Sequence, residues 1–333
     1  MERLSINSEE AKLIRDTHAL FIGADATSEK SLAAIREMAI LSCPTPLIVL
    51  LRAMSSRQGA SGALLVQQLT DQSDLPSTPV RPNATPENKL TLLSEVVELG
   101  IAFILGEPVA YQAEKDGALV QHVFPVRSEQ EASSNESSAS MLDLHTELVF
   151  SSRNPKRPLA ADSPDFILLS CLRSDPGHEA TTVVVEVEDL CAKIPPPHLS
   201  VLRQPRFELR APYSFTRKLA GDRPWIGPVP LLGQIAMRPT AAFDLACGTR
   251  GLDPKAELAL QALRETAALP GVIQRIQLQE GDLLVLDNRR CAHGRTPFVA
   301  AYDGNDRWIQ RIYVRRSLDG MQPLDSARSP RIF

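Results

Sequence analysis

The chain has 333 residues, of which 43% are hydrophobic and 23% charged, and its formal net charge is −4. This is globular composition with enough chain for a large core, and the weak negative charge offers no general attraction to nucleic acid or to an anionic membrane. The N-terminal segment is charged where a signal peptide needs an apolar core, and no apolar run approaches the roughly 20 residues of a membrane span. We therefore expect no nucleic-acid or membrane partner; the oligomeric state is left open.

Cysteine usage indicates the redox compartment. The five cysteines are Cys43, Cys171, Cys191, Cys247 and Cys291. They are odd in number and contain no C-x-x-C pair, which disfavours a disulfide framework and a structural zinc site. Free thiols are typical of a reducing compartment, so we expect a cytoplasmic protein.

The first 116 residues are predicted to be largely helical. Segments 8–20 and 28–41 carry apolar residues at helical spacing. Thr85-Pro86-Glu87 combines a capping residue with a proline at the first helical position, ahead of the apolar segment 89–106. Between these helices, GALLVQQL at 62–69 is a predicted strand.

From about residue 117 the pattern changes to short β-rich segments separated by turns. The predicted strands lie within 118–126, 141–150, 165–174, 181–187, 206–211, 233–239, 272–278, 282–288 and 307–316. One helix, 254–269, interrupts them and is expected to pack outside the sheet. Many short strands with Pro, Gly and Asp between them favour a barrel or jelly roll over a parallel βαβ sheet. No repeat and no clean linker divides the chain.

The segment 126–140 is polar and serine-rich. It is either a plain surface loop or a lid that orders over an adjacent active site, since it directly precedes the segment with the first candidate metal ligand.

Two histidines stand in contexts that suggest metal chemistry. His145 and Glu147 lie in the strand-like segment LDLHTELVF, where residues i and i+2 point to the same face. An imidazole and a carboxylate presented together form two positions of a 2-His-1-carboxylate facial triad. His293 follows an apolar segment and a turn at 287–290 and could supply the third. A lone H-x-E is weak evidence, so the second context is needed.

The motifs around these residues resemble a known family. G-D-L-L-V-L-D-N-x-R-x-x-H-G-R-T-P-F, followed by D-R-W-x-x-R-x-Y, resembles the C-terminal half of clavaminate-synthase-like oxygenases, within the taurine-dioxygenase superfamily. H-T-E followed by an apolar strand and L-R-x-D-P resembles the N-terminal half. The histidines lie 148 residues apart (293 − 145), and the resemblance spans roughly 117–316. Within the family, the free amino-acid hydroxylases of arginine, asparagine and lysine type are the most similar.

The resemblance implies a fold that is mainly β with flanking α-helices, built as a double-stranded β-helix (jelly roll). It implies a single oxygenase domain over 1–333, with a largely helical part at 1–116, a catalytic core at 117–316 and a tail at 317–333. It also implies Fe(II) held by His145, Glu147 and His293, with 2-oxoglutarate and O2 as co-substrates.

Further residues are carried over to the co-substrate. An arginine 14 residues beyond the distal histidine pairs with the far carboxylate of 2-oxoglutarate in this family, and Arg307 stands there. A planar guanidinium suits that bidentate contact. A threonine hydroxyl often assists it; Thr181 and Thr182 are the candidates, and because they alternate faces only one points inward, for which Thr182 is favoured.

The remaining candidates concern the substrate. Arg311 lies four residues beyond Arg307, on the same face of one predicted strand, and could bind the α-carboxylate of an amino acid; the alternative is a structural salt bridge. The resemblance implies that Asp244, 49 residues before His293, contacts the polar end of the substrate. Gln121 is a candidate contact for the α-amino or α-carboxylate group, or an ordinary strand residue.

The expected function is hydroxylation of an aliphatic C–H, at C3 or C4, of a free L-amino acid with a polar or cationic side chain. The arginine-type pattern can carry a second acid where this chain has Ala246, so lysine, citrulline and a cyclic amine such as pipecolate stand beside arginine. Alternatives are a related oxygenase that desaturates or cyclises another small intermediate, and a jelly-roll protein that binds a small ligand without redox chemistry.

Overall fold

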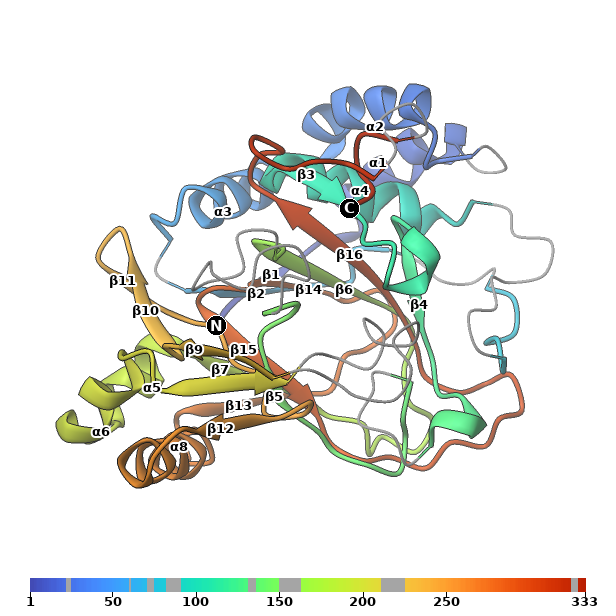
Figure 1. Cartoon of the computed structure of the whole chain (residues 1–333). Coiled ribbons are helices and arrows are strands. Elements are labelled where there is room, and N and C mark those ends of the chain that lie inside the picture. The colour runs from blue at the N-terminus through green and yellow to red at the C-terminus, as the bar shows by residue number, and fades with distance from the viewer. Residues whose placement is uncertain are drawn as a thin grey trace.

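The computed structural model describes residues 1–21, 25–59, 61–70, 75–81, 91–130, 136–149, 163–210, 225–324 and 329–333. Two β-sheets occupy its centre, and helices cover the outer side of each (Figure 1). The N-terminal helices lie over the larger sheet, and helices from the second half of the chain lie over the smaller one.

The larger sheet joins strands from both ends of the chain. Its order is β1-β2-β14-β6-β16-β3, and β4 also pairs with β16. The strands are β1 (Glu2–Ser5), β2 (Ala63–Gln67), β3 (Glu107–Val109), β4 (Gln121–Val123), β6 (Phe166–Arg173), β14 (Leu283–Asp287) and β16 (Trp308–Arg315). Only β1 and β2 run parallel; the other pairs are antiparallel.

The smaller sheet has the order β13-β7-β15-β5 and is antiparallel throughout. Its strands are β5 (Leu142–His145), β7 (Thr182–Glu186), β13 (Ile273–Ile276) and β15 (Cys291–Arg295). Because β14 and β15 are joined by a short turn at 288–290, one connection links the two sheets.

Alternation along β14 shows how the two sheets share one core. Leu284 and Leu286 pack with Val184 of β7 and Ile276 of β13, between the sheets. Leu283 and Val285 point the other way and pack against the N-terminal helices. A strand that is apolar on both faces reads as a continuous hydrophobic run, which is the pattern of LLVL.

Some of the described helices begin at a capping side chain and others do not. The described helices are α1 (Ser8–His18), α2 (Glu29–Ser42), α3 (Thr45–Ser55), α4 (Leu93–Leu105), α5 (Val187–Lys193), α6 (Pro196–Leu202) and α8 (Pro254–Ala267), with short 3₁₀ turns at Ala19–Phe21, Lys115–Gly117 and Arg127–Glu129. Asn7 forms a capping box with Glu10 at α1, and Asp253 caps α8, which has a proline in its first turn. Among the described residues, no single helix is long and apolar enough to cross a membrane; α2 and α3 pass that test only together, bent by 119°.

The described residues also form two small sheets. Strands β8 (Phe207–Arg210), β9 (Trp225–Val229) and β12 (Thr249–Gly251) form one, and β10 (Leu232–Ile235) pairs with β11 (Arg238–Ala241). The single strand predicted at 233–239 is therefore wrong. Ala236 and Met237 have positive φ values and turn the chain into a hairpin, which a pattern of alternating residues does not reveal.

Most predicted helices and strands are confirmed within a few residues of their expected bounds. The cap predicted at Thr85-Pro86-Glu87 lies outside the described residues, and α4 begins only at Leu93, after an extended Leu92.

Candidate active site

Two neighbouring strands bring the two histidines together. His145 is the last residue of β5, and it lies directly opposite His293 in the antiparallel pair of β5 and β15. Side chains directly opposite each other in such a pair share a face. Their ring centroids are 4.4 Å apart, although the residues are far apart in the sequence.

Gly294 permits this close pairing. A Cβ atom at Gly294 would lie 2.5 Å from the carbonyl oxygen of Leu142 on β5. Any side chain there would push β5 away from β15, so the position next to His293 requires glycine.

Glu147 lies in a turn and not on the predicted strand. Strand β5 ends at His145, and Glu147 lies in the turn that follows it. The expectation that both residues alternate on one strand is therefore wrong, because Thr146 already bonds to the backbone of Phe243 and the chain leaves the β5–β15 ladder. The two side chains nevertheless converge.

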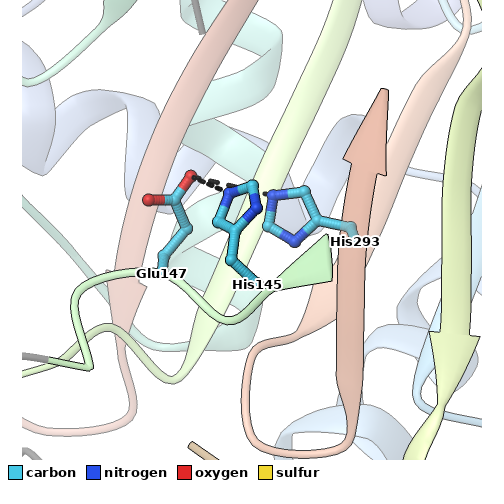
Figure 2. A group of neighbouring side chains, drawn as sticks. All are labelled: His145, Glu147 and His293. Atoms are coloured by element: carbon cyan, nitrogen blue, oxygen red, sulfur yellow. Dashed lines mark ion pairs between the residues drawn. The ribbon is translucent and has the colours of Figure 1, made fainter. Parts of the chain in front are cut away.

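The three side chains form one cluster (Figure 2). Glu147 Oε1 lies 3.8 Å from His145 Nε2 and 3.7 Å from His293 Nε2, and one ligand atom from each residue lies within 4.8 Å of the others. His145 Nδ1 lies 2.9 Å from the carbonyl oxygen of Asp143. A carbonyl only accepts, so Nδ1 carries the hydrogen and the neutral ring presents its Nε2 lone pair to the cluster. Two imidazoles and one carboxylate fit a facial triad for iron.

The charges of the cluster are unequal. Burial alone would raise the pKa of Glu147, but the Arg311 guanidinium and the two histidines outweigh it and hold that pKa well below its usual range. Burial also lowers the pKa of His145, yet hydrogen bonding and charge from Glu147, with the charge of Asp244, raise it to about 9. Burial and the positive charge of His145 lower the pKa of His293 to about 4. One proton therefore resides on His145 when no metal is bound.

Arg311 lies directly beside the cluster, on β16. Its Nη1 donates to Glu147 Oε1 at 2.8 Å, and its Nε and Nη2 donate to Gln121 Oε1 at 3.0 and 2.6 Å. Nη2 also lies 3.2 Å from Glu114 Oε2. Tyr313, two residues further along the same face, donates its hydroxyl to Glu147 Oε2 at 3.0 Å. Arg311 therefore has structural salt bridges, and it also adjoins the proposed metal ligands.

Asp244 approaches from the side of the smaller sheet. It forms an isolated antiparallel bridge with His145 and is 5% exposed. Its Oδ1 accepts a hydrogen bond from the amide of Cys247 at 2.6 Å. Burial raises the pKa of Asp244, and the charge of His145 opposes that effect. A second carboxylate thus lies close to the cluster.

Arg307 occupies a separate position. It directly precedes β16, and the bulge beside it adds its extra residue to β6 rather than to β16, so the shared face of Arg307 and Arg311 stays a prediction. Burial lowers the pKa of Arg307, and burial together with the charge of Arg307 lowers the pKa of Arg295 to about 10. Within the described part of the chain, no carboxylate forms an ion pair with Arg307. The charge of Asp175 opposes the fall in the pKa of Arg307, and an anion that binds near Arg307 and Arg295 would have the same effect.

The two threonines differ in environment. Thr182 begins β7, is 4% exposed and pairs with Arg295 across the β7–β15 ladder. Thr181 is partly exposed, and its hydroxyl lies 3.5 Å from the carbonyl oxygen of Glu179. The burial of Thr182 is consistent with the preference for it.

The segment 126–140 is described on both sides of 131–135. Arg295 Nη2 donates to the carbonyl and hydroxyl oxygens of Ser137, both at 2.9 Å, and Lys115 pairs with Glu136. Glu136 and Ser137 of this segment therefore contact Lys115 and Arg295, and Arg295 is two residues beyond His293.

Sequence reasoning missed Glu114 and Tyr313 as neighbours of the cluster. Tyr313 has a usable signal, since it is two residues beyond Arg311 on a strand. Glu114 has none, because it lies in an irregular turn in which Lys115 and Asp116 take positive φ values. His122 accepts from the indole of Trp308 and lies beside Glu95 of α4, rather than near the metal cluster.

The comparisons with known proteins agree with this arrangement. The model of the taurine catabolism dioxygenase TauD, TfdA family matches residues 86–313. An L-asparagine oxygenase of Streptomyces coelicolor is 36% identical over 273 residues, which cover 80% of this chain and 76% of the relative. An L-lysine 3-hydroxylase of Catenulispora acidiphila is 30% identical over 304 residues, covering 89% and 77%.

A solved structure of asparagine oxygenase, in complex with Fe(II), (2S,3S)-3-hydroxyasparagine and succinate, superposes with a TM-score of 0.82 at 29% identity. The superposition covers 96% of this chain and 95% of that one. On the family match and on the identity to curated relatives, the chain belongs to the TauD/TfdA family of dioxygenases.

Proposed function

We propose that the chain is an Fe(II)- and 2-oxoglutarate-dependent hydroxylase of a free L-amino acid with a polar or cationic side chain. One observation carries the proposal: the Glu147 oxygen that faces both histidines also accepts from Arg311 at 2.8 Å. A buried cation able to bind a substrate carboxylate thus adjoins a facial-triad donor set.

His145, Glu147 and His293 would hold the metal. Bound Fe(II) would supply the oxidising chemistry with O2, with 2-oxoglutarate as the co-substrate that would be decarboxylated to succinate. The side chains of the three ligands are 11%, 11% and 8% exposed, so the chain itself keeps bulk water from the cluster.

Arg307 and Thr182 are the proposed contacts of 2-oxoglutarate. A guanidinium binds a carboxylate through two parallel hydrogen bonds, and Arg307 has no ion-pair partner among the described carboxylates. The hydroxyl of Thr182 would add a donor, with Thr181 as the weaker candidate. Arg295, whose pKa is lowered by the charge of Arg307, would add positive charge there.

The backbone end of the amino acid would bind at Arg311. Its guanidinium would take the α-carboxylate, and Glu114 and Gln121, which both contact Arg311, would accept from the α-ammonium group. A cation flanked by a carboxylate and an amide oxygen complements a zwitterion.

Asp244 would bind the far end of the substrate. A buried carboxylate with a raised pKa gains most from a ligand that donates N–H or carries positive charge. Arginine, lysine, citrulline and a cyclic amine such as pipecolate meet that requirement, with hydroxylation at C3 or C4. Ala246 provides no second acid, which disfavours a strict preference for arginine.

The finer architecture belongs to the same proposal. The two facing sheets would form a double-stranded β-helix, and 1–333 would be one oxygenase domain with its catalytic core at 117–316. The participation of β1 and β2 in the larger sheet supports a single domain, because the N-terminal part completes that sheet. Five free cysteines are consistent with a cytoplasmic protein.

A first experiment tests the iron centre. The full chain is mixed anaerobically with Fe(II) and 2-oxoglutarate, and the visible absorption of the iron–2-oxoglutarate chelate is recorded. We expect a band in the wild type and none in His145→Ala. A wild type without the band, or an equal band in the variant, contradicts the proposed centre.

A second experiment tests the substrate. Free arginine, lysine, citrulline, asparagine, glutamine and pipecolate are incubated with Fe(II), 2-oxoglutarate and ascorbate, and the products are analysed by mass for the gain of one oxygen. For the accepted substrate, Asp244→Asn should raise KM about 10- to 100-fold, the size of one lost charged hydrogen bond, while the chelate band persists. Arg311→Ala is a poorer probe, because Arg311 also contacts Glu147. Failure of every amino acid would reject the substrate class.

A further inference from the structure

The backbone of Glu147 has an unusual partner. Strand β5 ends two residues earlier, so neither the amide nor the carbonyl of Glu147 takes part in the β5–β15 ladder. The neighbouring residues are bonded elsewhere: Thr146 N donates to Phe243 O at 2.9 Å, and Ser163 Oγ donates to Leu148 O.

Both backbone groups of Glu147 instead pair with one side chain, that of Asn288. Glu147 N donates to Asn288 Oδ1 at 2.7 Å, and Asn288 Nδ2 donates to Glu147 O at 3.0 Å. The carboxamide therefore replaces a neighbouring strand, since it offers one acceptor and one donor to the same residue as a peptide group in a ladder does.

Asn288 is itself held rigidly. Its side chain is buried, with 1% of the residue exposed. Its backbone N–H donates to Asp165 O at 2.8 Å, and its side-chain Nδ2 also donates to Pro164 O at 2.9 Å. Asp165 is bound in turn by Arg57 at 3.2 Å. The carboxamide thus has a fixed orientation before any ligand binds.

Asn288 lies close in the sequence to His293, a second proposed metal ligand. Asn288 lies in the turn between β14 and β15, and β15 carries His293 five residues later. One turn therefore positions two of the proposed ligands: His293 through the strand that it begins, and Glu147 through the Asn288 side chain.

We propose that Asn288 is a positioning residue for the metal centre, which sets the location of the Glu147 carboxylate relative to His293. This inference rests on the proposed function, because it assumes that Glu147 is a metal ligand. Groups that orient ligands contribute to metal affinity, and their loss typically weakens it about 10- to 100-fold.

The test measures metal affinity in the full chain, with Mn(II) as a stand-in for Fe(II) that resists oxidation by air. Titration calorimetry gives the Kd of wild type, Asn288→Asp and Asn288→Ala. We expect Kd to rise about 10- to 100-fold in Asn288→Ala, and by a smaller factor in Asn288→Asp, which keeps an acceptor for the Glu147 amide.

Asn7→Ala is the matched control. It removes the capping box of α1, away from the cluster, and should lower Tm without changing Kd. A Kd within twofold of wild type in both Asn288 variants overturns the inference, as does an equal rise in Asn7→Ala. If Asn288→Ala does not fold, Asn288→Asp decides by the same twofold limit. A wild type that binds no Mn(II) rejects the proposed function instead, so the two failures are distinguishable.

Discussion

At the scale of single residues, the two histidines are chemically identical but electrostatically different. Glu147 and Asp244 both act on His145 and raise its pKa to about 9, whereas His293 has a pKa of about 4 because it is buried beside a positively charged His145. Metal binding requires both imidazoles to be neutral, so only the proton on His145 competes with the metal near neutral pH.

This difference predicts the pH dependence of metal affinity. Between about pH 6 and about pH 9, the Kd for Mn(II) should fall about tenfold per pH unit, and it should level off above about pH 9, because one proton is displaced. Calorimetry in buffers of different ionisation enthalpy should record the release of close to one proton per metal at pH 7. An affinity that does not change over this range contradicts the charge assigned to His145.

The free energy of unfolding of the metal-free protein should decrease as the pH rises, whereas the metal affinity increases. The pKa of His145 is raised above its ordinary value of 6.5. Its contribution to the free energy of unfolding is therefore fully present below about pH 6.5 and is lost as the pH rises through about 9.

The sequence could identify the site residues that belong to regularly spaced motifs. His145, Glu147 and His293 were found by motif, and the structure brings their side chains together. Glu114 contacts Arg311 from an irregular turn, and the Asn288 side chain contacts the backbone of Glu147; neither residue belongs to a regularly spaced pattern. The shared face of Arg307 and Arg311 stays a prediction, because Arg307 lies just before β16 and the bulge beside it adds a residue to β6, not to β16.

At the scale of elements, helix α8 covers the outer face of the smaller sheet. Its buried residues, which include Leu260 and Leu263, pack with Leu202 of α6 and Val185 of β7. Asp253 Oδ1 accepts hydrogen bonds from the amides of Lys255 and Ala256 at 2.9 and 3.1 Å, and these amides have no partner within the helix.

Loss of this cap should destabilise the fold without affecting the site. Asp253→Ala should lower the free energy of unfolding by about 1 kcal/mol, the usual cost of losing an N-cap, as measured by urea denaturation. The Kd for Mn(II) should stay at the wild-type value, because α8 lies on the far side of the sheet from the metal cluster. A change in Kd would show that α8 also influences the position of the ligands.

Elements with a strong period were predictable, and those set by tertiary contacts were not. The helices over 8–20, 28–41 and 254–269 and the strands around 166–173 and 308–315 follow from apolar spacing and caps. The end of β5 at His145 does not, because it depends on contacts with Phe243 and Asn288, which are distant in the sequence. The hairpin at 232–241 depends on positive φ values at residues that rarely adopt them.

At the scale of the whole molecule, both sheets contribute to the site. Arg311 comes from the larger sheet, and the two histidines come from the smaller one. A ligand held between the sheets binds only the folded chain, so it must stabilise the whole molecule.

That coupling can be measured by thermal unfolding. With 2-oxoglutarate present throughout, Mn(II) at 100 times its Kd should raise the free energy of unfolding by about 2.7 kcal/mol. For a chain of this size, that is an increase in Tm of about 5 °C, at about 2 °C per kcal/mol. His145→Ala should show no such increase. If the Tm of the wild type does not change when both ligands are added, the site is not formed between the sheets.

The direct opposition of His145 and His293 has a consequence for how such a chain tolerates change. The pairing does not depend on the number of residues between His145 and His293. Loops in that interval can therefore become longer or shorter without separating the two rings. A single residue inserted within β5 or β15 has the opposite effect, because it turns every later side chain of the strand to the other face. Insertions and deletions are therefore tolerated in the connecting loops but not within β5 or β15. Strand β15 also contains Gly294, which allows the two strands to pair closely.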